Sequence, residues 1–269
     1  MSTPAEPNEQ NKMTILQHTV ELLSRLRIII ISIIFLGFFV AFWPLDITKI
    51  FSPTLEYTPV VSLIMNRMKQ DLLPAGARLI AGNIMDTAYL YLSISLMIGI
   101  ILSSPVIAYE LYMFFSPALY PHEKKWLSRI IFGFVGLFVF GAILAYKVML
   151  PITFRILMWF VTSTGAEPFF NIADFVGVIV TLLIGVSLLY VSPIIIIFLA
   201  IQGIVNSGYL TSNRKLVYAG FIVIAAILTP DPTIISDIIL FIPWLFLFEA
   251  TIFIIKRIEK TRTALEQEK

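Results

Sequence analysis

Long apolar runs alternate with short polar segments along most of this chain. The runs predict six membrane-spanning helices, at about residues 28–43, 88–115, 127–150, 174–202, 215–229 and 234–255. Several runs reach the ~20 residues that a helix needs to cross a bilayer, whereas the strands of an outer-membrane barrel would alternate over ~10 residues. The pattern predicts an all-α integral membrane protein with one six-helix domain over residues 15–255.

Prolines mark the expected bends and ends of these helices. Pro105, Pro193 and Pro243 lie inside the second, fourth and sixth runs, where each removes a backbone hydrogen bond. Bent helices predict a cupped bundle. Pro44 and Pro151 are expected to end the first and third spans. The fifth run would be only ~23 Å long as a helix, so the ~30 Å bilayer core must thin there or admit water.

The remaining segments are polar or amphipathic. Residues 15–27 have helical spacing and predict an amphipathic helix that leads into the first span. Residues 60–72 predict another amphipathic helix, lying on the membrane surface or capping the bundle. Loops are expected at 156–172, where Asn171 or Asp174 can cap the next helix, and at 203–213.

The two ends of the chain are predicted to be tails. Residues 1–14 are polar, contain two prolines and predict a disordered tail, and residues 256–269 predict a basic tail. Basic residues indicate the orientation, because cytoplasmic loops are richer in them. Of 19 lysines and arginines, 13 fall on the side of the two termini. The other six are Lys49, Arg67, Lys69, Arg78, Lys147 and Arg155. Both termini, and the loop near residue 120, are therefore predicted to be cytoplasmic.

Composition agrees with a membrane protein and narrows the chemistry. The chain is 58% hydrophobic and 13% charged, whereas a soluble domain is about 25% charged. It has no cysteine, which excludes disulfides, thiolate metal sites and cysteine nucleophiles. Only two histidines are present, so little supports a histidine metal site. No cofactor or metal is expected.

The stretch from Ser104 to Trp126 carries the most distinctive chemistry. It begins in an apolar helix that Pro117 is expected to end, and it closes in a polar loop that contains Glu123 and Lys124. Carboxylate, ammonium and aromatic groups held together at a membrane face suit the docking of a charged peptide.

Four motifs, in order along the chain, resemble those of the TatC family, the multispanning core subunit of the twin-arginine protein translocase. The sequence HTVELLSRL at 18–26 resembles the family's HLxELRxRL opening, and SPVIAYELYMFFSPALYPHEKKW at 104–126 resembles its SPxxxYQxWxFxxPaLyxxErr signature. Residues 141–151 resemble its GxxFaYxxvxP pattern, and residues 228–249 resemble its TPPDxxSQxxLxxPxxxLxE pattern.

The resemblance implies a function that hydropathy alone does not indicate. It implies six spans in the cell membrane, no enzymatic chemistry, and recognition of signal peptides that carry two adjacent arginines. It also implies export of folded proteins, driven by the proton-motive force, together with TatA-type single-span subunits. A TatB-type component stays open. The working complex is expected to be a homo-oligomer, and no nucleic acid partner is implied.

The chain departs from the family pattern at several polar positions. Leu23 replaces the first arginine of the opening motif, and Glu110 replaces a glutamine. Asp237 replaces the glutamine of the sixth span, and the family's aspartate falls on Thr233 or near Asp231. Val191 stands where many relatives have a glutamate, so the role of that glutamate cannot be transferred to this chain.

Two carboxylates are the candidates for binding the paired arginines. Glu21 and Glu123 match the family's glutamates, and each charge-assisted hydrogen bond to a guanidinium contributes roughly 1.5–3 kcal/mol. Phe114 can pack against the peptide or stack on a guanidinium. Weaker members of the predicted site are Glu110, His18, Arg25, Pro117 and Lys124.

Each of these assignments has a plainer alternative. Glu123 can be a solvated charge paired with Lys124, and Glu110 can extend toward the interface rather than add a third carboxylate. Asp237 is predicted to face a partner or a cavity. Glu249 is predicted to contact the basic end near Lys256.

Two other functional classes fit this sequence less well. A small-solute or ion secondary transporter needs polar groups near the bilayer midplane, whereas the ionisable groups here cluster at helix ends. An intramembrane hydrolase needs paired aspartates at mid-depth, a serine–histidine pair or a zinc motif, and the sequence offers none of them.

Overall fold

The computed structural model describes residues 15–44, 58–115, 127–231 and 233–267. Its helices are α1 (Ile15–Phe42), α3 (Val60–Leu72), α4 (Met85–Phe115), α5 (Leu127–Leu144), the π-helix η4 (Ala145–Met149), α6 (Leu150–Ser163), α7 (Ile172–Ile201), α8 (Ser207–Ser212), α9 (Arg214–Leu228) and α10 (Ile234–Gln267). Two short strands, β1 (Arg78–Ile80) and β2 (Phe169–Asn171), pair in parallel.

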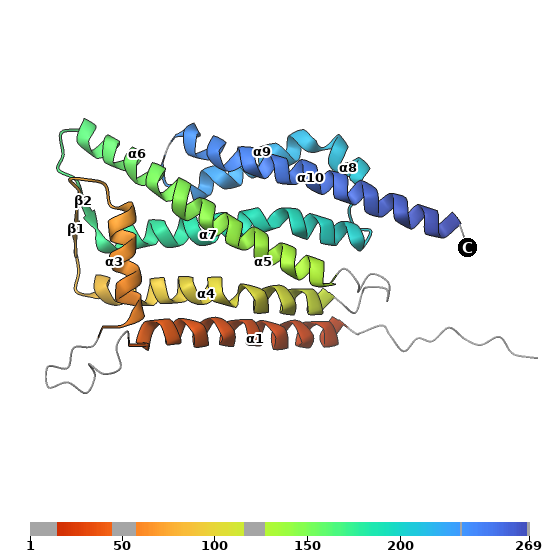
Figure 1. Cartoon of the computed structure of the whole chain (residues 1–269), viewed down its shortest axis with the longest axis horizontal. Coiled ribbons are helices and arrows are strands. Elements are labelled where there is room, and N and C mark those ends of the chain that lie inside the picture. The colour runs from red at the N-terminus through yellow and green to blue at the C-terminus, as the bar shows by residue number, and fades with distance from the viewer. Residues whose placement is uncertain (1–14, 45–57, 116–126, 232, 268–269) are drawn as a thin grey trace, which may run out of the picture.

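The helices form an elongated bundle with two different ends (Figure 1). One end, here the terminal end, holds the start of α1, the end of α4, the start of α5 and the end of α10. The other end, here the capped end, holds α3, the two strands and the turn between α9 and α10 (Figure 1). The described residues on either side of 116–126 therefore lie at the same end of the bundle as the start of α1, as the predicted topology requires.

The predicted all-α membrane class is confirmed. Among the described residues, five helices are long and apolar enough to span a bilayer. They are Thr19–Phe42, Met85–Phe114, Ser128–Ser163, Ile172–Ile201 and Ile234–Thr261. α9 has only 15 residues, as the sequence indicated. Because α7 and α10 both run from the capped end to the terminal end (Figure 1), α9 must return between them, which agrees with six spans.

α7 is the central helix of the bundle. It packs against α4, α5, α9 and α10, and its buried side chains join the main apolar core. Two hydrogen bonds tie it to α10: the Tyr190 hydroxyl donates to the Leu240 carbonyl at 2.7 Å, and the Trp244 indole donates to Ser192 Oγ at 3.0 Å. These bonds hold α10 at a fixed height along α7.

α3 caps the bundle, which was one of the two predicted positions for this helix. Val61, Met65, Met68 and Leu72 recur at helical spacing and are buried in the main core. Across this contact the Tyr146 hydroxyl donates to Asp71 Oδ2 at 2.9 Å. The amphipathic pattern therefore reflects packing on other helices.

The sequence analysis expected the third helix to end at Pro151, and this expectation is wrong. The chain continues from α5 through η4 into α6 and ends only at Ser163. Proline has no amide hydrogen for the carbonyl four residues earlier, which usually breaks a helix. The wider π turn just before Pro151, closed by the Leu150 amide on the Ala145 carbonyl, accommodates the ring at the start of α6.

Three further boundaries differ from prediction. The expected loop at 156–172 contains the end of α6 and strand β2, and the expected loop at 203–213 contains α8. α10 continues to Gln267, so most of the predicted basic tail is helical. The predicted cap is confirmed, because Asn171 Oδ1 accepts the Ala173 amide at 2.8 Å. Residues 1–14 lie outside the described residues.

Candidate functional site

A charged cluster joins the start of α1 to the end of α4 at the terminal end. Glu21 and Arg25 are four residues apart, so both project from the same face of α1. Arg25 donates to Glu21 Oε1 twice, from Nη2 at 2.7 Å and from Nε at 3.0 Å. The helical spacing alone brings this pair together.

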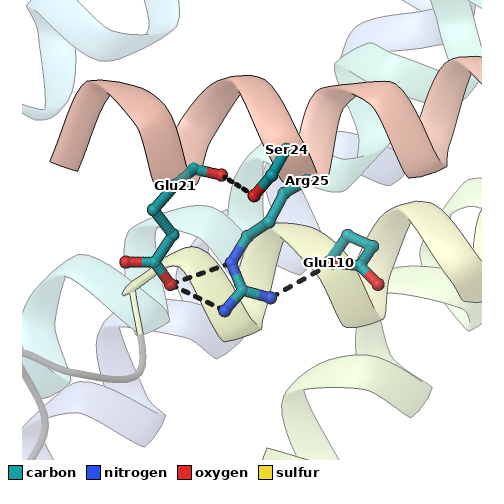
Figure 2. Close-up of polar contacts among 4 residues, drawn as sticks. All are labelled: Glu21, Ser24, Arg25 and Glu110. Atoms are coloured by element: carbon teal, nitrogen blue, oxygen red, sulfur yellow. Dashed lines mark hydrogen bonds and ion pairs between the residues drawn. The ribbon is translucent and has the colours of Figure 1, made fainter. Parts of the chain in front are cut away.

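Glu110 reaches the same guanidinium from α4. Arg25 Nη1 donates to Glu110 Oε2 at 3.1 Å, so one arginine bridges two carboxylates on different helices (Figure 2). The Glu110 residue is only 7% exposed. The alternative of a charge extended toward the interface is therefore wrong, since a buried carboxylate is stable only when paired.

The cluster has an excess of acceptors. Two carboxylates face one guanidinium, which leaves one net negative charge. Glu21 Oε2 is buried and has no hydrogen-bond partner among the described residues (Figure 2). Such a group attracts a further cation, and a guanidinium suits a carboxylate best because its planar donors match the oxygen geometry.

The other predicted members of the site divide into two groups. Phe114 is half-buried, one helical turn after Glu110 on α4. Glu123, Pro117 and Lys124 lie outside the described residues, so the predicted pairing of Glu21 with Glu123 stays a prediction. His18 belongs to α1, but its side chain is also outside the described residues.

Glu249 was predicted to contact the basic end near Lys256, but its partners lie elsewhere. Its Oε2 lies 3.1 Å from Arg214 Nη2, and its Oε1 accepts from the Tyr218 hydroxyl at 2.6 Å. Both partners lie on α9, and they reach Glu249 because α9 packs against α10. Glu249 therefore ties two helices together.

Asp237 lies at the beginning of α10, where its Oδ1 accepts from Thr229 Oγ1 at 3.2 Å. It is half-buried. Its role in facing a partner or a cavity stays a prediction.

Asp231, which the sequence analysis placed only near the position of the family's aspartate, is a buried carboxylate. It is 5% exposed and accepts hydroxyl hydrogen bonds from Thr233, from Ser236 at 2.8 Å and from Thr153 at 3.4 Å. Thr153 comes from α6, so the carboxylate joins that helix to the start of α10. The close spacing of an aspartate, a threonine and a serine before an apolar run was the available signal.

Val191 occupies an apolar environment. It is 1% exposed and packs with Ala108, Phe134 and Phe138 between α4, α5 and α7. A glutamate here would need a polar partner that this cluster does not supply. The absence of the glutamate thus matches the local packing.

Comparison with known proteins gives one consistent result. The family described as "Sec-independent protein translocase protein (TatC)" matches residues 17–243. The chain is 29% identical over 251 residues to a TatC protein of Carboxydothermus hydrogenoformans, covering 93% of this chain and 96% of the relative. It is 30% identical over 246 residues to TatCy of Bacillus subtilis, covering 91% and 90%.

The fold is similar to that of a solved protein described as the twin-arginine translocase receptor TatC. A crystal structure of it superposes with a TM-score of 0.70 at 27% sequence identity and covers 89% of this chain and 98% of the other. A second crystal structure, in the detergent DDM, gives a TM-score of 0.71 at the same identity.

Proposed function

This chain belongs to the TatC family of Sec-independent protein translocase proteins, and on that premise we propose that it binds twin-arginine signal peptides at the terminal end of its bundle. It is a multi-pass protein of the bacterial cell membrane. In this role it recognises the export signal and serves as the core of the translocase. The terminal end faces the cytoplasm, where signal peptides arrive.

The observation that carries this proposal is that Glu21 already accepts a guanidinium. Arg25 donates two hydrogen bonds to Glu21 Oε1, which leaves Oε2 as a buried acceptor. The site therefore has the geometry for arginine and one negative charge in excess. Glu123 supplies the second carboxylate, and Phe114 packs against the peptide beside it.

The proposal includes partners beyond the peptide. TatA-type single-span subunits assemble with this chain and move folded cargo across the membrane, driven by the proton-motive force. Several copies of the chain form the working complex. We also include the weaker predicted members, His18, Pro117 and Lys124, in the peptide site.

The structure gives little support to the alternative function of a small-solute or ion transporter. A hollow of about 680 Å³ lies beside the first turns of α4 and α7, near the capped end. The Asp86 carboxylate that borders it accepts the amides of Gly82 and Asn83 at 2.9 Å and so holds the preceding turn. The hollow is not at mid-depth, where transporters bind their substrates.

Binding of signal peptides to the purified chain in lipid nanodiscs tests the proposal. We expect a peptide with paired arginines to bind roughly 10–100-fold more tightly than the same peptide with paired lysines, because lysine cannot donate in a planar fork. Glu21→Ala and Glu123→Ala should each remove most of this preference. Glu167→Ala, an exposed carboxylate near the capped end, is the matched control. Equal binding of the two peptides by the unaltered chain would refute the proposal.

A further inference from the structure

The chain's own Arg25 occupies the carboxylate that the proposed function assigns to the signal peptide. Its Nε and Nη2 both donate to Glu21 Oε1, and these are the contacts that an arginine of the peptide would make. An incoming guanidinium must therefore share Glu21 with Arg25 or displace it.

Glu110 gives Arg25 a second anchor that does not depend on Glu21. The Nη1–Oε2 hydrogen bond of 3.1 Å comes from the opposite side of the guanidinium and from a different helix (Figure 2). The Glu110 side chain is 9% exposed, against 17% for Glu21 and 21% for Arg25. Since the more deeply buried carboxylate has the greater need of a counter-ion, Arg25 should leave Glu21 before it leaves Glu110.

We propose that Arg25 is an internal substitute for a signal-peptide arginine, and that Glu110 retains it when the peptide takes over Glu21. The inference rests on the proposed function. Arg25 and Glu110 then set the affinity of the peptide site, although the peptide's paired arginines need not touch Glu110.

The contacts that the exchange restores show where discrimination against lysine arises. When a guanidinium replaces Arg25 on Glu21, both hydrogen bonds to the carboxylate are restored, so the exchange is nearly balanced. A lysine ammonium is a point charge without a planar fork and cannot restore them in the same geometry. Displacing Arg25 costs the same for either peptide, so Arg25 sets the affinity for both, and the preference for arginine comes from the fork contacts with Glu21 itself.

Two variants should change the affinity in opposite directions. Glu110→Gln removes the second anchor, so Arg25 holds Glu21 more firmly and affinity for the paired-arginine peptide should fall by about tenfold. The double variant R25Q/E110Q removes the competitor and the buried Glu110 charge, and it leaves Glu21 without a counter-ion until the peptide binds. Its affinity for the paired-arginine peptide and for the paired-lysine peptide should each exceed that of the unaltered chain by about tenfold, so the preference between the two peptides should not change.

Arg27→Gln is the matched control, because it removes an exposed arginine from the same helix without altering the cluster. Its affinity for each of the two peptides should equal that of the unaltered chain. Thermal unfolding of every variant in the same nanodiscs, together with the R25Q/E110Q measurement, separates loss of structure from loss of competition.

The outcomes distinguish this inference from the proposed function. One outcome is that the unaltered chain prefers paired arginines while R25Q/E110Q binds them no more tightly than the unaltered chain does. In that case Arg25 positions Glu21, the competition is refuted, and the proposed function stands. A Glu110→Gln variant with unchanged affinity would refute the anchoring role. If the unaltered chain shows no preference for arginine, the proposed function fails and this inference fails with it.

Discussion

At the scale of single residues, buried carboxylates in this protein accept hydrogen bonds from distant parts of the chain. Glu110 on α4 meets Arg25 on α1, and Asp231 beside α10 meets Thr153 on α6. Both carboxylates are less than 10% exposed. Loss of a partner therefore leaves an unsatisfied polar group in a poorly hydrated place, which is costly.

Asp231 provides a test of this cost. Asp231→Ala leaves three hydroxyl groups without their acceptor and should lower the free energy of unfolding by about 2–4 kcal/mol. Asp231→Asn keeps one acceptor oxygen and should lose about half as much. Thermal unfolding of the purified variants in detergent measures both.

The control for this measurement is Asp174→Ala, which removes an exposed carboxylate from the first turn of α7. It should change the free energy of unfolding by only about 0.5 kcal/mol. If Asp231→Ala unfolded at the same temperature as Asp174→Ala, the hydroxyl network would have no stabilising role.

At the scale of helices, the contact between α1 and α4 positions the candidate site. The helices approach closely where Gly37 faces Gly99: a Cβ on Gly99 would lie 2.7 Å from the Ile33 carbonyl oxygen and 3.0 Å from the Gly37 nitrogen. Small residues allow such contacts between membrane helices. Because Arg25 and Glu110 lie on these same two helices, we expect the spacing between them to depend on this contact.

Substitution of Gly99 tests this dependence. Gly99→Ala should force the two helices apart and lower the free energy of unfolding by roughly 1–3 kcal/mol. It should also weaken binding of the paired-arginine peptide, because Glu110 moves away from Arg25. Peptide titration and thermal unfolding measure the two effects.

Gly136 on α5 supplies the comparison, because nothing lies within 4 Å of a Cβ placed there. Gly136→Ala should be neutral or slightly stabilising, since alanine favours helix by about 1 kcal/mol over glycine. Equal effects of the two substitutions would exclude a special role for the α1–α4 contact.

At the scale of the whole molecule, the distribution of basic residues matches the two ends of the bundle. Arg67, Lys69 and Arg78 belong to elements at the capped end, whereas Lys256 and Lys260 belong to the last part of α10, toward the terminal end (Figure 1). The positive-inside rule then places the terminal end in the cytoplasm. The orientation stays a prediction.

Cysteine labelling in whole cells tests both the orientation and the six-span count, because the natural chain has no cysteine. Glu167→Cys, between α6 and β2, and Ile234→Cys, at the start of α10, should react with an impermeant thiol reagent added outside. Thr211→Cys in α8 and Lys260→Cys should react only after the membrane is permeabilised. Reaction of Thr211→Cys and Ile234→Cys from the same side would show that α9 does not cross the membrane.

The sequence by itself determined the membrane class, the positions of the long helices, the short α9 and the family. These properties depend on local hydropathy and on motifs that are contiguous in the chain, so they can be found without a structure. It also singled out Glu21 and Glu110, but it could not show that both carboxylates bind the same arginine, Arg25. Where it relied on proline as a helix end, at Pro151, it was wrong, because a π turn removed the steric conflict.

Only the tertiary structure decided which polar groups meet. Arg25 and Glu110 are 85 positions apart, and Thr153 and Asp231 are 78 apart. No periodicity connects such residues; their contact depends on how closely helices pack and at what height each lies beside its neighbour. The structure thus turned Glu21 and the weaker candidate Glu110 into a site that already holds an arginine, because packing of α1 on α4 brought both acceptors to one guanidinium.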